Sequence, residues 1–131
     1  MILLDTHAWV WLVSEPGKLS GRAEAFIERA LRKNEVLISA MSAWEVALLV
    51  SQKRLELTME VSEWISISEK LPFLRFVPID NTIAIQAVYL PMPLHSDPAD
   101  RIIIATSMKY GAPIVTMDRK ILDFPHVQGI W

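Results

Sequence analysis

Met1-Ile2-Leu3-Leu4-Asp5-Thr6-His7 is an apolar run that ends in a carboxylate, and this stretch decides how the chain folds. The run shows no alternation of polar and apolar residues, which is typical of a strand buried on both faces in the middle of a parallel sheet. In open α/β sheets, ligands bind in the crevice beyond the carboxyl ends of the strands. We therefore expect Asp5 to stand at such a crevice, where it could also cap the following helix.

Apolar strands alternate with helical segments along the rest of the chain. The expected strands cover residues 1–4, 36–39, 76–79, 113–117 and, with a weaker pattern, 127–131. The expected helices cover residues 6–13, 19–34, 42–53, 57–71, 81–89 and a last segment that begins near Asp100 and stops at Gly111. Such alternation predicts parallel βαβ units with right-handed crossovers. The predicted fold is a single three-layer α/β/α domain over residues 1–131, with a central, mostly parallel sheet of four to five strands.

The composition excludes several classes of protein. The chain has no cysteine, which rules out a disulfide framework and thiolate metal sites. No apolar run approaches the length of a membrane span, about 18 residues, and Asp5 and His7 interrupt any signal sequence. We therefore expect a soluble, cytoplasmic protein that does not bind membranes. The net charge of −2 carries no nucleic-acid signature by itself, so a nucleic-acid partner stays open.

Three further acids stand in positions that match that of Asp5. Asp118 also follows an apolar strand, and neighbouring strands would place both carboxylates at one crevice. Glu45 and Asp100 each fall in the first turn of a helix on the same side. Four carboxylates gathered there would repel one another unless cations were present, and Mg²⁺ or Mn²⁺ prefers such oxygen ligands. A site of this kind can hydrolyse a phosphodiester bond.

Other interpretations of these residues remain open. Ser42 and Glu45 match the S-x-x-E capping box, so Glu45 could serve only to satisfy a helix end. Motifs of other chemistries are missing, since the chain has neither a phosphate-binding G-x-x-x-x-G-K-[ST] loop nor a G-x-S-x-G elbow. A phosphoacceptor receiver domain is disfavoured because Asp5 and Asp80 lack the accompanying acidic pair.

Four segments together resemble one known family. They are Met1-Ile2-Leu3-Leu4-Asp5-Thr6-His7, Ser42-Ala43-Trp44-Glu45, Asp97-Pro98-Ala99-Asp100-Arg101-Ile102-Ile103-Ile104-Ala105-Thr106 and Gly111-Ala112-Pro113-Ile114-Val115-Thr116-Met117-Asp118. Each motif alone is weak, but the four in this order and at these separations closely resemble a PIN-domain protein, and specifically a VapC-type toxin ribonuclease. The likeness spans nearly the whole chain.

The resemblance implies a parallel sheet flanked by helices and an RNA-cleaving activity that depends on Mg²⁺ or Mn²⁺. It also implies a homodimer and a small cognate antitoxin. Its acidic quartet of catalytic and metal-binding residues matches Asp5, Glu45, Asp100 and Asp118. Asp97 is a competing or additional acid, and Thr116 matches a hydroxyl that supports the site. The alternative is a catalytically silent PIN-like module that binds protein or RNA, and the presence of all four acids argues against it.

Several nearby residues have two possible roles. Thr6 is a weaker hydroxyl candidate, and His7 lines the cleft or packs at a helix start. His95 is either a metal ligand or proton carrier, or simply a surface residue. Arg101 pairs with Asp97 or contacts a phosphate. Basic residues beside Asp118 either contact an RNA backbone or serve solubility; they are Arg119 and Lys120. The tryptophans Trp9, Trp11, Trp44 and Trp64 are expected in the core or in a hydrophobic groove that holds an antitoxin helix.

Overall fold

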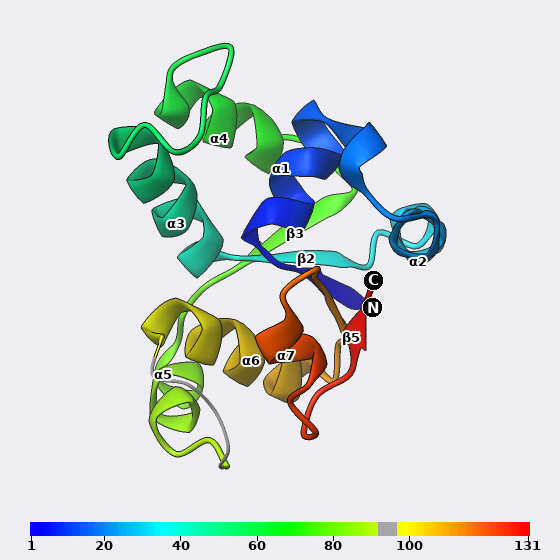
Figure 1. Cartoon of the computed structure of the whole chain (residues 1–131), viewed down its shortest axis with the longest axis vertical. Helices are drawn as coiled ribbons and strands as arrows, with labels where there is room; N and C mark the ends of the chain where they lie inside the picture. Colours follow the sequence, from blue (N-terminus) through cyan, green and yellow to red (C-terminus); the bar gives the residue numbers. More distant parts are fainter. Residues whose placement is uncertain (92–96) are drawn as a thin grey trace.

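One parallel sheet of five strands organises the molecule. The computed structural model describes residues 1–91 and 97–131, and in these the strand order is β3-β2-β1-β4-β5 (Figure 1). The strands are β1 (Ile2–Leu4), β2 (Val36–Ser39), β3 (Leu74–Val77), β4 (Ile114–Val115) and β5 (Gly129–Ile130). The chain builds away from β1 as far as β3 and returns to the other side of β1 with β4. The switch point therefore lies between β1 and β4, as expected.

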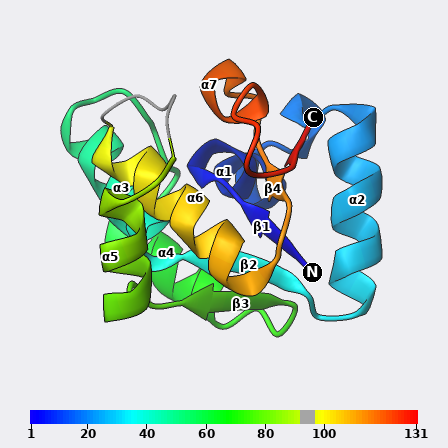
Figure 2. The same ribbon diagram turned by 90° about the horizontal axis from the view of Figure 1, so that it is seen from below.

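Helices cover both faces of this sheet, which confirms the three-layer α/β class. One set consists of α1 (Thr6–Ser14), α2 (Gly21–Arg32), α3 (Ala40–Ser51) and α4 (Val61–Glu69), with the short 3₁₀ helix η1 (Pro16–Lys18) after α1. The opposite set consists of α5 (Asn81–Val88), α6 (Pro98–Tyr110) and α7 (Arg119–Leu122). Figure 2 shows α6 lying across the sheet with α5 beside it. Among the described helices, none has the length and apolar character needed to cross a membrane.

The first strand is buried on both faces, which explains its unbroken apolar run. Ile2 and Leu4 pack into the core on the side of α1–α4, whereas Leu3 packs into the core beneath α6 and α7. Successive strand residues point to opposite faces, so an apolar residue is needed at every position. On the α1–α4 side, the ring of Trp9 contacts those of Trp64 and Phe76 at centroid distances of 4.9 and 5.4 Å. Trp9 and Trp64 are thus core residues, as predicted.

Several element boundaries differ from those predicted, and local capping explains the differences. Helix α3 begins at Ala40 because the Ser39 hydroxyl accepts a hydrogen bond from Met41 N at 3.0 Å. Helix α4 is shorter than expected because Glu60 caps it. Strand β3 lies two residues earlier than expected, so that Pro78 follows its end and removes no ladder hydrogen bond. Helix α7, which has only four residues, was not predicted.

Gly111 ends α6 in the left-handed conformation, with φ of 62°, as the sequence predicted for a C-cap. Gly111→Ala should lower the free energy of unfolding by about 1–2 kcal/mol, because an L residue is strained at this φ. Gly21 is the matched control. It starts α2 with ordinary backbone angles and open space around it, so Gly21→Ala should be neutral or stabilising. Urea unfolding followed by tryptophan fluorescence measures both, and equal effects would contradict this assignment.

Candidate active site

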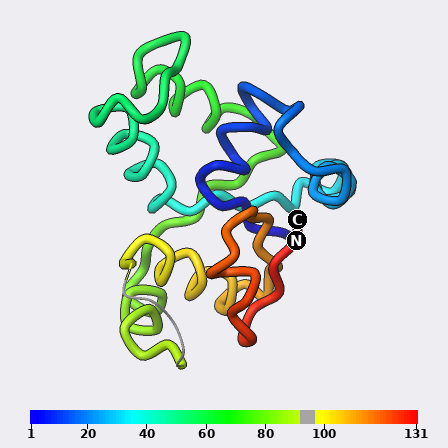
Figure 3. The backbone as a smooth tube through the Cα atoms, viewed as in Figure 1, coloured from blue at the N-terminus to red at the C-terminus, as the bar shows by residue number. Residues whose placement is uncertain are grey.

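A cavity of about 690 Å³ opens at the carboxyl ends of β1 and β4 and collects every acid singled out from the sequence. Figure 3 shows the first segment of the chain running close to the last, and the pairing of β1 with β4 fixes their register. The carboxylates that line the cavity are those of Asp5, Glu45, Asp97, Asp100 and Asp118. They come from four segments of the sequence, and the fold brings all of them to one place.

Asp5 is held by two hydrogen bonds from different parts of the chain. Its carboxylate accepts one from Ala8 N at 2.8 Å, and it thereby caps α1. The second carboxylate oxygen accepts a short hydrogen bond from the hydroxyl of Thr116. Burial raises the pKa of Asp5 above its ordinary value, and these two hydrogen bonds only partly offset that effect. The helix-cap role and the cavity position of Asp5 therefore exist together.

Thr116 links the two acids that follow β1 and β4. It is completely buried, and while its hydroxyl donates to Asp5 it accepts a hydrogen bond from Asp118 N at 3.0 Å. Asp118 in turn caps α7 by accepting from Lys120 N at 2.9 Å. One side chain thus fixes the distance and orientation between the two strand ends.

Asp97 and Asp100 both lie at the start of α6. The Asp97 carboxylate caps this helix, accepting hydrogen bonds from Ala99 N at 2.9 Å and from Asp100 N at 3.2 Å. Pro98 occupies the first helical turn, where its missing N–H is not needed. Asp100 follows in the same turn and also lines the cavity. The structure places both acids at the cavity, so both stay candidates.

Glu45 is not part of a capping box, which corrects that alternative interpretation. Ser42 lies inside α3, and the helix is capped by Ser39 instead. Because α3 begins at Ala40, Glu45 lies in the second turn, and its predicted place in the first turn was wrong. The Glu45 carboxylate accepts a 2.6 Å hydrogen bond from the Thr6 hydroxyl, which also lies 3.0 Å from that of Ser42. Burial raises the pKa of Glu45, and the nearby acids Asp100, Asp97 and Asp5 add to this effect. A carboxylate surrounded in this way has a strong electrostatic reason to bind a cation.

Thr6 and Ser42 contribute more to the site than their sequence positions indicated. The two buried hydroxyls join α1 to α3 and hold Glu45 toward the cavity. Thr6 directly follows Asp5, and a hydroxyl beside a strand-end acid is a usable signal. Ser42 carried a misleading signal, because its spacing from Glu45 imitates a capping box.

Of the other candidate residues, some line the cavity and others are engaged elsewhere. His7 lines the cavity and packs against Trp11, with ring centroids 5.6 Å apart, so that both interpretations of it hold. Arg101 donates hydrogen bonds to the carbonyl oxygens of Ala87 at 2.8 Å and Val88 at 3.1 Å, at the end of α5. Arg119 pairs with Asp123 at 3.2 Å. His95 lies outside the described residues. Trp44 is 55% exposed and lines the cavity rather than the core.

The donor set suits a hard divalent cation, since it consists of carboxylate and hydroxyl oxygens. Within residues 1–91 and 97–131, however, no three histidine or acidic side chains are arranged so that they could already hold a metal ion. Capping explains part of this, because oxygens of Asp5, Asp97 and Asp118 accept hydrogen bonds from backbone N–H groups. Side-chain rotation is therefore needed before several of these acids can share one cation.

Comparison with known proteins identifies the family. Residues 2–127 match the sequence profile of the PIN domain. The chain belongs to the PIN domain family. It is 37% identical to Ribonuclease VapC22 from Mycobacterium tuberculosis, in a match that covers 98% of this chain and 95% of that protein. The resemblance to VapC-type proteins expected from the four segments is confirmed.

Solved structures share the fold of this PIN domain chain. VapBC2 from Rickettsia felis, bound to a DNA fragment from its promoter, matches with a TM-score of 0.70 and 17% identity over 98% of this chain and 97% of that one. A toxin–antitoxin complex from Klebsiella pneumoniae matches with a TM-score of 0.61 and 24% identity, covering 97% and 95% of the two chains. At these identities the likeness establishes the fold alone.

The bridging role of Thr116 can be measured as stability. Thr116→Val keeps the shape of the side chain but leaves the N–H of Asp118 without its acceptor. The free energy of unfolding should therefore fall by about 1–3 kcal/mol. Thr106→Val is the matched control, because Thr106 is equally buried and its hydroxyl donates to Ile102 O, an acceptor that already serves the helix. Urea titration of both variants should show the larger loss for Thr116. A larger loss for Thr106 would contradict the bridge.

Proposed function

We propose that the protein is an endoribonuclease that depends on Mg²⁺ or Mn²⁺, hydrolyses phosphodiester bonds of RNA and acts as the toxin of a toxin–antitoxin pair. The observation that carries this proposal is the convergence of five carboxylates on one cavity in a PIN domain chain. The 37% identity to a protein named as a ribonuclease supports RNA as the substrate. We further propose that residues 1–131 act as one PIN-like domain and that the protein works in the cytoplasm, where such RNA is found.

The metal ligands in this proposal are Asp5, Glu45, Asp100 and Asp118. Asp97 is placed second, because Asp100 has the spacing to Ile103-Ile104-Ala105 that the resemblance to PIN-domain proteins implies for the third acid. A bound divalent cation would favour ionisation of an attacking water and offset negative charge on the scissile phosphate. Thr116 and Thr6 are positioning residues, since their hydroxyls hold Asp5 and Glu45. Burial raises the pKa of Glu45, and repulsion from the nearby acids adds to this effect. A cation would relieve the repulsion.

A cognate antitoxin and a second copy of this chain are the proposed protein partners. The complexes from Rickettsia felis and Klebsiella pneumoniae share this fold and support the first of these. The cavity lining also includes exposed apolar side chains, those of Trp44, Leu48 and Met117, all of which are at least 36% exposed. Exposed apolar side chains beside a polar site suit an amphipathic partner helix.

The alternative is a catalytically silent module that binds RNA or protein through the same cavity. One observation favours it, namely that no three acids in the described residues are already arranged to hold a cation. Carboxylates that lack a cation repel one another and turn toward hydrogen-bond donors, so the same observation fits an active enzyme before it binds metal. Only the nuclease would turn over RNA, so a cleavage assay distinguishes the two functions.

Metal dependence is the first test. The purified protein should cleave single-stranded RNA when Mg²⁺ or Mn²⁺ is added, lose this activity in EDTA and regain it when Mn²⁺ is restored, because the acids need a cation to act on a phosphate. Gel electrophoresis of labelled RNA follows the products. Cleavage that persists in EDTA would contradict the metal-dependent mechanism. Tight RNA binding without turnover in Mg²⁺ or Mn²⁺ would support the silent module.

Asp5→Asn tests whether the first strand-end acid serves chemistry rather than folding. Asparagine keeps the oxygen that caps α1, and its amide NH2 can donate to the Thr116 hydroxyl in place of accepting from it. It also removes a charge whose burial is unfavourable, so the melting temperature should not fall. RNA cleavage should fall at least about 100-fold. Asp80→Asn is the matched control, since Asp80 caps α5 through Ile83 N and does not line the cavity. Equal loss of activity in both variants, or unfolding of Asp5→Asn, would count against the assignment.

A further inference from the structure

Two basic side chains line the cavity among its acids. They are Arg54, just beyond the end of α3, and Lys120 in α7. Both residues are exposed, and neither forms an ion pair within the described part of the chain. The basic residues next to them in the sequence differ: Arg119 is paired with Asp123, and Lys53 points away from the molecule. The charges of Arg54 and Lys120 thus remain available at the mouth of an acidic cavity.

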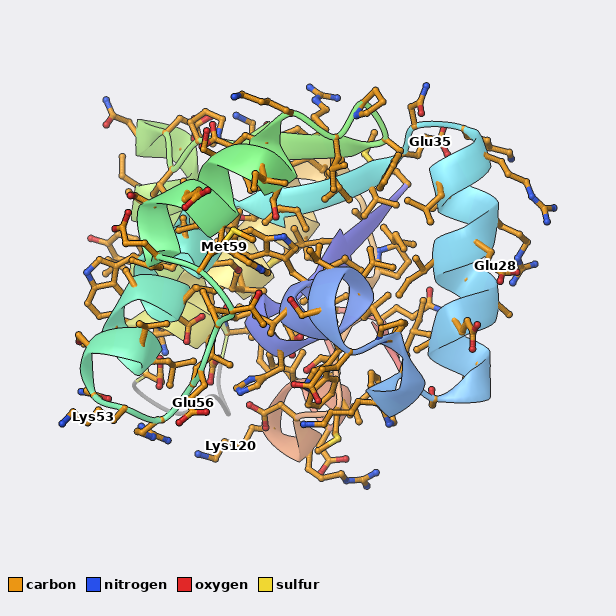
Figure 4. The ribbon with its side chains drawn as sticks, turned by 90° about the horizontal axis from the view of Figure 1, so that it is seen from above. Glu28, Glu35, Lys53, Glu56, Met59 and Lys120 are labelled. Carbon is orange, nitrogen blue, oxygen red and sulfur yellow. The ribbon has the colours of Figure 1, made fainter. Side chains whose placement is uncertain are left out.

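A left-handed turn brings Arg54 to the cavity. Helix α3 ends at Ser51, and Lys53 then adopts a φ of 58°, which is sterically unfavourable for a side chain other than glycine. This turn is closed by a hydrogen bond from Arg54 N to Leu49 O at 2.9 Å. As a result Arg54 lines the cavity, whereas Lys53 does not, and Figure 4 shows Lys53 pointing away from the molecule.

Lys120 reaches the cavity from the other side of the sheet. It belongs to α7, which lies on the face opposite α3 (Figure 1), and its backbone N–H is fixed by the Asp118 cap. Its neighbour Arg119 instead pairs with Asp123 at 3.2 Å and does not line the cavity. Figure 4 shows Lys120 at the same end of the molecule as Lys53, away from α2. Each of the two segments therefore contributes one cavity-lining cation beside one that is turned away.

The position of these cations suits a chain of phosphates rather than a single one. The hydrogen bond from Arg54 N to Leu49 O brings Arg54 back to the level of Leu49, which is four residues, or about 6 Å along a helix, from Glu45. Arg54 therefore lies about one helical turn beyond Glu45, beside the place where a phosphate would bind at that acid. The acids repel a polyanion, and cations on both sides of them offset this repulsion while leaving the acids free to bind metal.

We propose that Arg54 and Lys120 form a phosphate clamp, in which each cation holds a backbone phosphate of single-stranded RNA on one side of the bond to be cleaved. This clamp rests on the proposed function and assigns the binding residues for its substrate. The bound species is a polynucleotide with phosphates on both sides of the reacting one.

Binding is tested with charge-matched pairs of variants. Each is made in the Asp5→Asn background, which prevents cleavage, and titrated with a fluorescent, unpaired RNA oligonucleotide in Mg²⁺ at several salt concentrations. Arg54→Gln and Lys120→Gln should each raise Kd about threefold to tenfold and reduce the slope of log K against log salt by about 0.7. Lys53→Gln and Arg119→Gln remove the same charge from adjacent residues, and they should change Kd less than about twofold.

Arg54→Lys should restore most of the salt slope, because it restores the charge without the guanidinium. If the Arg54 variants melt at the same temperature as the parent protein, the change in RNA binding is not caused by a disturbed end of α3. Equal effects of the cavity-lining and outward-facing variants would overturn the clamp, since binding would then depend on total charge alone. Failure of the RNA to bind would overturn the clamp as well.

Cleavage by the protein with an intact Asp5 judges the proposed function separately. In that protein Arg54→Gln should raise KM and leave kcat nearly unchanged. Cleavage together with no difference between the paired variants overturns the clamp alone. Absence of cleavage together with a clear difference between the pairs overturns the nuclease and supports the clamp as an RNA-binding device.

Discussion

The hydrogen bond from Thr116 to Asp5 is the constraint on which the site depends. It joins the ends of β1 and β4, the two strands at the switch point of the sheet, and it orients a carboxylate whose pKa is raised by burial. The same hydroxyl accepts from the backbone of Asp118, so one buried side chain sets the position of two acids. Asp97 and Asp100 approach this fixed pair from the start of α6, and Glu45 approaches it from the second turn of α3.

Helix capping and the acidic cavity are two uses of the same side chains. Asp5, Asp97 and Asp118 cap α1, α6 and α7, and each lines the cavity. A capping aspartate has a backbone conformation fixed by the helix that follows it, and its second oxygen can accept from another group, as that of Asp5 does from Thr116. The start of a helix thus supplies an acid in a defined place at little extra cost in ordering, after a parallel strand for Asp5 and Asp118 and after α5 for Asp97. The N-cap interpretation of Asp5 was therefore correct and incomplete.

Unbroken apolar runs made the sheet predictable, because Leu3 must be buried on one face and Leu4 on the other. The positions of Asp5 and Asp118 followed from strand order. Contacts between helices were harder to foresee, since the hydrogen bond from Thr6 to Glu45 spans 39 residues and depends on how α1 packs against α3. The boundaries of α3 and α4 were missed for a local reason, because Ser39 and Glu60 compete as caps with Ser42 and nearby residues.

The pairing of β1 with β4 also limits when the cavity can form. Thr116 and Asp5 are separated by 111 residues, and β4 contributes only two residues to the sheet. Contacts this distant in sequence must close a long loop before any gain is realised, and they form late in folding. A chain emerging from the ribosome lacks Thr116 until 111 residues after Asp5 have been synthesised. The complete acidic site is therefore absent from any nascent chain that ends before Thr116.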